Sequence, residues 1–308
     1  MHPFTTTSKE AVAALGEQRL IAAIRRWLGP ASPKTPFGIG DDCAVVHASP
    51  RRQLVTVDPV IYGAHFDDHV PSRAVGAKLL KRNLSDIAAM GGRPRAAVIA
   101  LALDARVKTA WLEGFYRGLA STARRYGVAI VGGDVAQHPG GIVGTLTLIG
   151  EAGGPRVITR TGARVGDWIY VTGVLGGSLP SGHHWRFTPR LAEGAWLAQA
   201  RGVRAMMDLS DGLAKDLHDL TPPGAEPALE ADAVPRRRGF DLRAALSDGE
   251  DYELLFALDA RSDRVRFERA WARRFATPLA CIGRFVRPEN RPAGALDLKP
   301  FHGFEHLR

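Results

Sequence analysis

The sequence predicts an α/β, or mixed α+β, protein with two domains, and three observations support this. The chain has 308 residues, more than a typical single domain. Segments with helical spacing of apolar residues alternate with short apolar runs that are typical of strands. After a Gly-Gly-Pro segment at 153–155 this alternation starts again. We therefore expect one domain over residues 1–152 and a second over residues 153–308.

The first domain is predicted to alternate helices with strands. Helices are expected where apolar positions recur at helical spacing. The predicted helices cover 9–28, with Ser8 as N-cap, 72–90, with Ser72 as N-cap, and 109–126. Gly29-Pro30 and Gly91-Gly92 are expected to end the first two of them. Strands are expected at the short apolar runs 43–46, 54–57, 96–103, 128–131 and 144–150.

The second domain repeats this kind of pattern. The segment GARVGDWIYVTGVLGGS is typical of a turn, a strand and a Gly-rich turn, and MMDLSDG is typical of a strand that leads into a helix. EDYELLFAL is a further apolar strand. Helices are expected over 189–201, 213–220 and 262–275.

Composition argues against several classes of protein. No apolar run is long enough to span a membrane, and the N-terminal MHPFTTTSKE lacks the basic start and apolar core of a secretory signal. With only Cys43 and Cys281, both in apolar settings, we expect a cytoplasmic protein with buried thiols and no disulfide framework. The net charge is +9, but the arginine pairs are scattered without interleaved aromatic residues, which favours a solvated basic surface over nucleic-acid binding.

Aspartates recur in five short segments that are rich in glycine or end a predicted element: GIGDD, TVD, NLSDIAAMGG, GGD and MDLSDG. In nucleotide sites Mg²⁺ is held by a few carboxylates and by phosphate oxygens, and glycines let the backbone approach the ligand. Alternation along a strand places Thr56 and Asp58 on one face, where a hydroxyl and a carboxylate together suit Mg²⁺. The pattern therefore predicts a site for metal and nucleotide.

Several of these acids also have a purely structural interpretation. Asp41 could cap a turn, and Asp58 could simply end a strand. Asp86 could pair with Arg82 four residues earlier, although its apolar neighbours favour an inward position beside a cation. These alternatives remain open from the individual segments.

The segment MDLSDG is expected to start a helix, with Ser210 as N-cap and Asp211 in the first turn, where a carboxylate is stabilised. The sequence contains no Walker-type phosphate loop and no convincing Ser/His/Asp or Cys/His set. Phosphates would then be held by metal ions, glycine backbone and basic side chains. Lys78 and Arg160 are the candidates for this last role.

Seven motifs, taken in order, make the chain resemble the thiamine-monophosphate kinase family: GIGDDCAVV, TVD followed by GAHF, NLSDIAAMGG, GGD, TRTGARVGDWIYVTG, MDLSDGLAKDL and ALSDGEDYELLF. The resemblance covers residues 16–308. It implies the two-domain fold of the superfamily that contains aminoimidazole ribonucleotide synthetase and selenophosphate synthetase. In that fold the N-terminal domain would bind ATP and Mg²⁺ and form a homodimer through its sheet, and the C-terminal α/β domain would complete the nucleotide and substrate site.

The resemblance also implies roles for individual residues. Metal ligands would be Asp41, Thr56, Val57, Asp58, Asp86, Asp134, Asp208 and Asp211. ATP contacts would come from Gly133, Asp134, Arg160 and Ser210, and substrate contacts from His65, Glu250 and Phe304. The implied reaction transfers phosphate from ATP to thiamine monophosphate and gives thiamine diphosphate and ADP. The attacking phosphate is already ionised near neutral pH, so no general base is required.

The chain departs from the family pattern at a few positions. Asp248 adds a negative charge where glycine is usual, Pro59 follows Asp58, and the segment after Ser178 is short. These departures leave two alternatives open. One is a relative on the same fold that phosphorylates another phosphorylated acceptor, and the other is a non-catalytic protein that binds nucleotide or nucleic acid.

Overall fold

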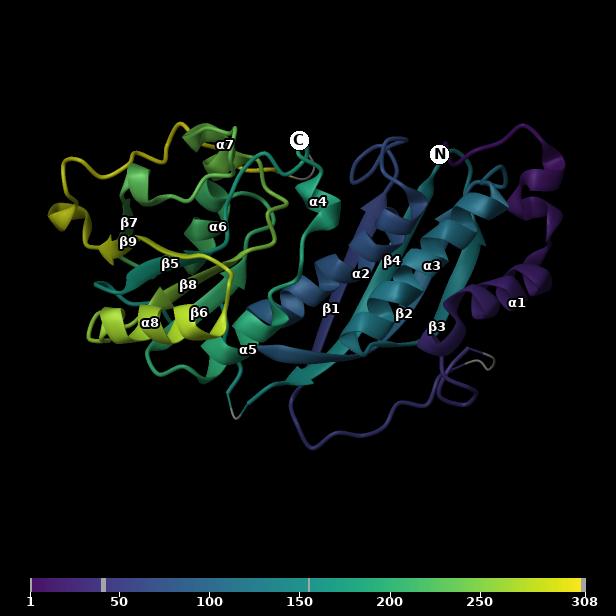
Figure 1. Cartoon of the computed structure of the whole chain (residues 1–308), viewed down its shortest axis with the longest axis horizontal. Helices are drawn as coiled ribbons and strands as arrows, with labels where there is room; N and C mark the ends of the chain where they lie inside the picture. The colour runs from purple at the N-terminus through teal and green to yellow at the C-terminus, as the bar shows by residue number, and fades with distance from the viewer. Residues whose placement is uncertain (1, 40–42, 155, 306–308) are drawn as a thin grey trace. The chain divides into compact units, whose positions relative to one another are not determined.

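The computed structural model describes residues 2–39, 43–154 and 156–305. Contacts divide the chain into two compact units, whose elements are labelled in Figure 1. The first unit contains Met1–Ile87 and Arg93–Glu151, and the second contains Ala88–Gly92 and Ala152–Arg308. The short segment Ala88–Gly92 therefore packs with the second unit, although it lies within the first along the sequence.

The first unit is built on a four-stranded sheet in the order β1-β4-β2-β3. Its strands are β1 (Gln53–Ile61), β2 (Gly92–Leu103), β3 (Ala129–Gln137) and β4 (Ile142–Ala152). β1 runs antiparallel to β4, and β2 runs parallel to β3. One face of the sheet is covered by helices, which are α2 (Ser72–Ala89) and α3 (Thr109–Tyr126), with α1 (Glu17–Leu28) against α3 (Figure 1).

The other face of this sheet carries exposed valines. Leu54 and Val60 of β1 are buried, whereas Val55 and Val57 between them are 67% and 58% exposed. Val98 of β2 is also exposed. Since the side chains of a strand point alternately to its two faces, these valines mark an apolar face that the helices leave uncovered.

The predicted strand at 43–46 is absent from the structure. Val45 and Val46 are exposed, and Cys43, which was expected to be buried, is exposed as well. A short apolar run forms a strand only where a free strand edge pairs with it and a core buries one of its faces. β1 is longer than predicted, so Asp58 lies within the strand and not after it.

The first helix begins later than predicted. α1 starts after Gly16, whose φ of +67° is a conformation that favours glycine. Ser8 is therefore not its N-cap, and the preceding residues form two short 3₁₀ turns, Ser8–Glu10 and Val12–Ala14. Gly29 ends α1, as predicted. Further 3₁₀ turns occur at Gly29–Ala31, Ala231–Ala233 and Pro288–Asn290.

The second unit is built on a five-stranded antiparallel sheet in the order β6-β8-β5-β9-β7. Its strands are β5 (Trp168–Thr172), β6 (Val203–Asp208), β7 (Glu226–Leu229), β8 (Leu254–Leu258) and β9 (Leu279–Val286). Its helices are α4 (His183–Arg186), α5 (Leu191–Gln199), α6 (Leu213–Leu220), α7 (Leu242–Ser247) and α8 (Arg264–Arg274).

Both faces of this second sheet are covered. Leu255 of β8 belongs to one apolar cluster with Leu217 of α6, and the next residue, Phe256, belongs to a second cluster with Trp271 of α8. A strand that is buried on both faces is apolar at every position, which explains why LLFAL shows no polar alternation. The fold is α/β, as predicted.

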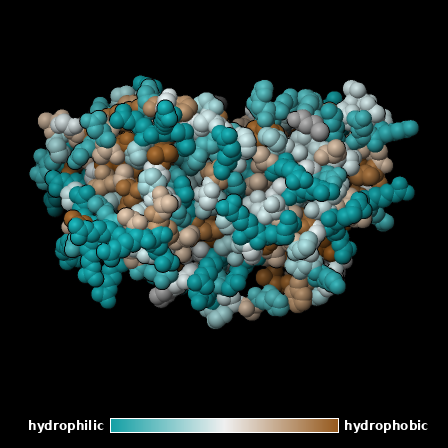
Figure 2. Space-filling view, in the orientation of Figure 1, coloured by the Kyte–Doolittle hydropathy of each residue, from teal (hydrophilic) through white to brown (hydrophobic). Residues whose placement is uncertain are grey.

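The surface of the molecule is mostly hydrophilic where Figure 2 shows it. On the side seen in Figure 2, hydrophilic residues dominate and apolar residues occur in small groups. Among the residues that the structure describes, no helix is both long and apolar enough to cross a membrane.

Candidate active site

The turn between β6 and α6 carries three of the predicted site residues, and a further acid, Asp216, organises it. Asp208 ends β6, and Ser210 and Asp211 follow in the turn. One oxygen of the Asp216 carboxylate accepts three backbone N–H groups, those of Ser210 and Asp211 at 3.0 Å and that of Gly212 at 3.2 Å. Ser210 is therefore not the N-cap of α6, and Asp211 precedes the helix. That prediction was wrong because α6 begins only after Gly212, whose φ of +112° favours glycine, and Asp216 holds the preceding residues in a turn.

The acids of this turn influence one another. Asp216 is buried, and burial raises its pKa to about 8, with the negative charge of Asp208 as the next largest cause. Asp208 is buried as well. Among the described residues, however, no three His, Cys, Asp or Glu side chains are arranged to hold a metal ion. The predicted ligand Asp41 and its neighbour Asp42 lie outside the described residues.

Two predicted substrate residues contact this turn, although they are distant in the sequence. The backbone N–H of Glu250 donates to the carbonyl of Ser210 over 2.7 Å, and that of Phe304 donates to the carbonyl of Asp211 over 2.8 Å. The Nζ of Lys215 donates to the Asp211 carboxylate at 2.7 Å and to the Phe304 carbonyl at 2.5 Å. The second unit thus brings together residues predicted to contact metal, nucleotide and substrate.

The loop that carries Glu250 has an unusual backbone held by polar contacts. Glu250 and Tyr252 have φ angles of +53° and +52°, which residues other than glycine rarely adopt. Asp251 between them is buried, and its carboxylate accepts the N–H of Gly176 and, at 2.6 Å, the hydroxyl of Ser178. Such strain persists only where the surroundings impose it, and it is common at functional sites.

Asp248, the acid that departs from the family pattern, has a structural partner in this loop. Its carboxylate accepts the backbone N–H of Gly177 at 2.7 Å. The contact fastens the loop to the Gly-rich turn after β5. The negative charge of Asp248 is therefore partly compensated by a backbone dipole.

In the first unit, one pair of predicted ligands is in direct contact. The hydroxyl of Thr56 in β1 donates to the carboxylate of Asp86 in α2. Asp58 lies two residues further along the same face of β1 and forms an ion pair with Arg82 of α2 at 3.2 Å. Val57 points to the opposite, exposed face, so its contribution to a metal site would be its carbonyl oxygen.

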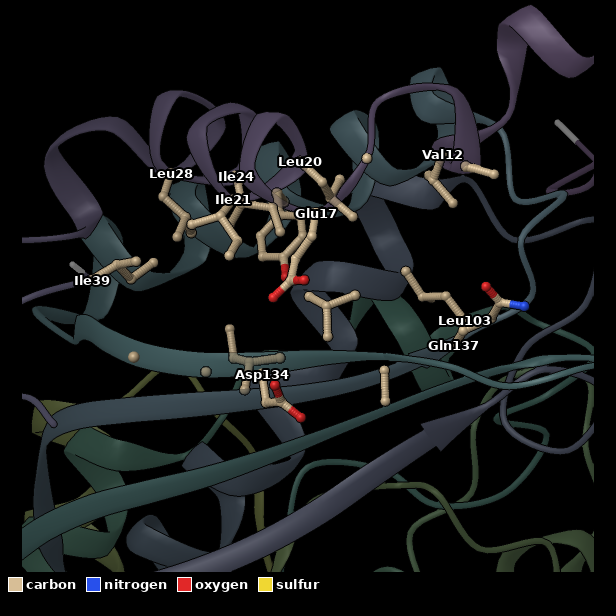
Figure 3. Close-up of a pocket in the computed structure, with 18 of the residues that line it drawn as sticks. Val12, Glu17, Leu20, Ile21, Ile24, Leu28, Ile39, Leu103, Asp134 and Gln137 are labelled. Atoms are coloured by element: carbon tan, nitrogen blue, oxygen red, sulfur yellow. The ribbon is translucent and has the colours of Figure 1, made fainter. Parts of the chain in front are cut away.

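Gly133 and Asp134 lie on β3, an edge strand of the first sheet. A Cβ on Gly133 would lie 2.2 Å from the carbonyl oxygen of Ile99, so a side chain does not fit there. A cavity of about 800 Å³ separates β3 from α1, and its lining is mostly apolar (Figure 3). Figure 3 shows the Glu17 side chain of α1 pointing into this cavity, whereas the Asp134 carboxylate turns to the side of β3 away from α1.

The predicted basic and imidazole groups have specific partners. The Nδ1 of His65 accepts the backbone N–H of Ile61 at 3.2 Å, so in the neutral ring Nε2 carries the proton and can donate it. Lys78 is fully buried and donates to the carbonyl of His65 at 2.8 Å. The prediction that Lys78 binds phosphate is therefore wrong, because its ammonium is used inside the unit. Arg160 is exposed and pairs with Asp219 of α6 at 2.7 Å.

Comparison with known proteins decides the family. A family model described as AIR synthase related protein, N-terminal domain, matches residues 40–152. A thiamine-monophosphate kinase from Rhodopirellula baltica is 36% identical over 274 residues, which cover 82% of this chain and 84% of that relative. The chain belongs to the thiamine-monophosphate kinase family.

Solved structures of thiamine-monophosphate kinases share this fold. The crystal structure of the protein from Stenotrophomonas maltophilia K279a aligns with a TM-score of 0.74 and 30% identity, and the alignment covers 89% of this chain and 95% of that one. The structure named AaThiL complexed with AMPPCP and TMP aligns with a TM-score of 0.72 and 28% identity, over 98% of this chain and 100% of that one.

Sequence reasoning missed two residues that shape the candidate site of this member of the thiamine-monophosphate kinase family. Asp216 had a local signal, because an acid early in a helix that follows a glycine turn can bind the free N–H groups at the helix start. His184 is different. Its Nδ1 lies 3.3 Å from the Glu250 carboxylate, and no local pattern indicates a partner so distant in the sequence.

Proposed function

We propose that this chain transfers the γ-phosphoryl group of ATP to thiamine monophosphate, which forms thiamine diphosphate and ADP. The observation that carries this proposal is the pair of hydrogen bonds that join Glu250 to Ser210 and Phe304 to Asp211. Phosphoryl transfer depends on holding donor and acceptor groups in line at short range. The name of the Rhodopirellula baltica relative and the AMPPCP and TMP in the AaThiL complex support the same reaction.

The chemistry requires alignment and no general base. The attacking oxygen belongs to a phosphate monoester whose second pKa is about 6, so it is mostly ionised near neutral pH. A bond forms between this oxygen and the γ-phosphorus while the bond from that phosphorus to the β,γ-bridging oxygen breaks, and ADP leaves with the electron pair. We assign His65 to the phosphate of the acceptor as a donor through Nε2, with its ring oriented by Ile61.

The proposed metal ligands offer the oxygen atoms that Mg²⁺ prefers. They are the side chains of Asp41, Thr56, Asp58, Asp86, Asp134, Asp208 and Asp211 and the carbonyl oxygen of Val57. Bound Mg²⁺ would neutralise phosphate charge so that two anionic groups can meet. The pKa of Asp216, raised by burial and by the charge of Asp208, is consistent with a turn that favours a nearby cation.

For ATP we propose contacts from Gly133, Asp134, Arg160 and Ser210. Residues 1–152 would bind ATP and Mg²⁺ and form a homodimer through the uncovered sheet face that carries Val55 and Val57. The exposure of these valines supports a dimer, because large apolar patches on a surface commonly mark interaction sites. Residues 153–308 would supply the other nucleotide contacts and the substrate contacts. We further propose that the protein acts in the cytoplasm.

The test is formation of thiamine diphosphate by the purified protein with ATP, Mg²⁺ and thiamine monophosphate. We expect Asp86→Asn and Asp134→Asn each to lower the rate by about 100-fold, because each removes a carboxylate that would bind metal. Asp263→Asn changes only the cap of α8 and should keep normal activity. Near-normal activity of the first two variants, or no product from the unchanged protein, would contradict the proposal.

A second candidate is a kinase for another phosphorylated acceptor, and it rests on Asp248 and Pro59. Turnover in a screen of phosphorylated acceptors, with none for thiamine monophosphate, would select it. We favour thiamine monophosphate because the Asp248 carboxylate is engaged with the N–H of Gly177. Salt-sensitive oligonucleotide binding without ATP turnover would instead indicate a non-catalytic protein.

A further inference from the structure

The carboxylate of Glu250 is held at both of its oxygens. The Nδ1 of His184 lies 3.3 Å from Oε2, and the hydroxyl of Tyr252 donates to Oε1 over 3.2 Å. The side chain of His184 is 8% exposed and that of Glu250 is 19% exposed. Because its backbone N–H also binds Ser210, Glu250 has little freedom to change direction.

The two groups that hold Glu250 are themselves fixed by packing. The ring of Phe187 stacks on that of Tyr252 with centroids 4.0 Å apart and an angle of 21° between the planes. Both of these aromatic residues are buried. The backbone N–H of His184 donates to the carbonyl of Ser178 at 3.1 Å. α4 and the residue after it therefore form a support that packs against the Glu250 loop.

We propose that His184 and Tyr252 are positioning residues that set the direction of the Glu250 carboxylate and thereby the affinity for a cationic acceptor. This inference rests on the proposed function, in which Glu250 contacts the acceptor. Thiamine monophosphate carries a permanent positive charge on its thiazolium ring, and a carboxylate is a natural partner for that charge. A carboxylate that is oriented before binding loses little conformational freedom on binding, so its orientation contributes directly to affinity.

The experiment compares KM for thiamine monophosphate with KM for ATP. Tyr252→Phe removes one hydroxyl and keeps the stack on Phe187, His184→Leu removes the imidazole, and His184→Asn restores a donor. We expect the first two variants to raise KM for thiamine monophosphate about tenfold with KM for ATP unchanged, and His184→Asn to recover most of the loss. Tyr170→Phe is the matched control, since it removes a hydroxyl that donates to Glu268 at 2.6 Å elsewhere in the second unit.

A second readout separates positioning from folding. Thiamine monophosphate binding is measured by calorimetry without ATP, together with thermal unfolding. Weaker binding by Tyr252→Phe at an unchanged melting temperature supports the inference. This comparison uses only Tyr252→Phe and the unchanged protein, so it holds even if His184→Leu does not fold. If the unchanged protein turns over normally and Tyr252→Phe binds thiamine monophosphate with the same affinity as the unchanged protein, this inference is overturned and the proposed function is not. Absence of both turnover and thiamine monophosphate binding overturns the proposed function and this inference with it.

Discussion

The backbone N–H of Glu250 and the carbonyl oxygen of Ser210 are joined by a hydrogen bond of 2.7 Å. This bond links the loop of the proposed acceptor residue to the turn of a proposed nucleotide residue. Gly249 makes the close approach possible, because its φ is +69° and an added Cβ would lie 2.7 Å from that same carbonyl oxygen. A side chain at position 249 would therefore push the loop and the turn apart.

We predict that Gly249→Ala lowers kcat/KM for thiamine diphosphate formation by about 100-fold, because a displacement of roughly 1 Å between reacting groups has an effect of this size. The free energy of unfolding should fall by about 2 kcal/mol, from the left-handed backbone and the close contact with Ser210. Steady-state kinetics and denaturant unfolding measure these two quantities.

Gly224→Ala is the matched control for this prediction. Gly224 has a similar φ of +73°, but an added Cβ there would meet nothing within 4 Å. The variant should lose about 1 kcal/mol of stability from its backbone conformation alone and keep normal kinetics. Equal kinetic effects in the two variants would contradict the role given to the contact between Gly249 and Ser210.

A second prediction concerns Lys215, whose ammonium bridges the Asp211 carboxylate and the Phe304 carbonyl. The hydrogen bond to Asp211 raises the pKa of Lys215, which keeps it charged at neutral pH. Lys215→Met removes the bond to the Phe304 carbonyl and leaves Phe304 attached to the turn through its N–H bond to the Asp211 carbonyl. We expect KM for thiamine monophosphate to rise about tenfold, the effect of losing one charge-assisted hydrogen bond. Lys299→Met, at an exposed position, should leave KM unchanged. The bridge has no functional role if KM is the same in both variants.

Local patterns are enough to predict most helices and several strands. The bounds of α6 follow from the sequence because Leu213, Leu217 and Leu220 recur at helical spacing and are all buried. The run at 43–46 has the composition of a strand but does not form one. Pairing requires a strand edge and a core elsewhere in the chain, and the composition of a short run carries no information about either.

The order of motifs predicts which residues form the candidate site, but it does not predict the partners of those residues. The contacts of Asp216 are local, so its role follows from an acid early in a helix. The environment of Lys78 does not follow from a local pattern. Its ammonium is buried and bonds to the carbonyl of His65, which lies outside the helix that carries Lys78. The same is true of His184, whose contact with Glu250 exists only once the second unit has folded.

A third prediction concerns the pH dependence of stability. Burial raises the pKa of Asp251 to about 6, although Ser178, Gly176 and Arg237 oppose this shift. Between the ordinary value of 3.8 and this raised value, the folded protein keeps the proton while the unfolded chain has lost it. The contribution of Asp251 to stability therefore falls as pH rises through this window, by roughly 3 kcal/mol over about two pH units.

Asp251→Asn cannot ionise and escapes this loss. The free energy of unfolding of this variant, minus that of the unchanged protein, should therefore be larger at about pH 7 than at about pH 4.5, by roughly 2 to 3 kcal/mol. Asp259→Asn is the control, because the hydrogen bond from Arg261 lowers the pKa of Asp259 to about 2, so its contribution is lost only at more acidic pH. Urea unfolding at both pH values measures the difference, and a constant difference for Asp251→Asn would contradict the effect assigned to burial.

The last prediction uses the two cysteines. Cys43 is exposed, whereas Cys281 in β9 is partly buried, and burial raises the pKa of the Cys281 thiol. The thiolate is the form that attacks disulfide reagents, so Cys43 should react at least about tenfold faster than Cys281 near neutral pH. Peptide mapping after labelling identifies which thiol has been modified.

Labelling of Cys43 also reports on the proposed metal site. Cys43 follows the proposed ligand Asp41 by two residues, so ATP with Mg²⁺ should slow its labelling and leave the slow reaction of Cys281 unchanged. Cys43→Ser should remove the fast phase and keep normal activity, since no role in binding or transfer is assigned to this thiol. Fast labelling that persists in Cys43→Ser would mean that Cys281 is the reactive thiol and that β9 opens to solvent. Labelling of Cys43 that ATP and Mg²⁺ leave unchanged would count against a ligand role for Asp41.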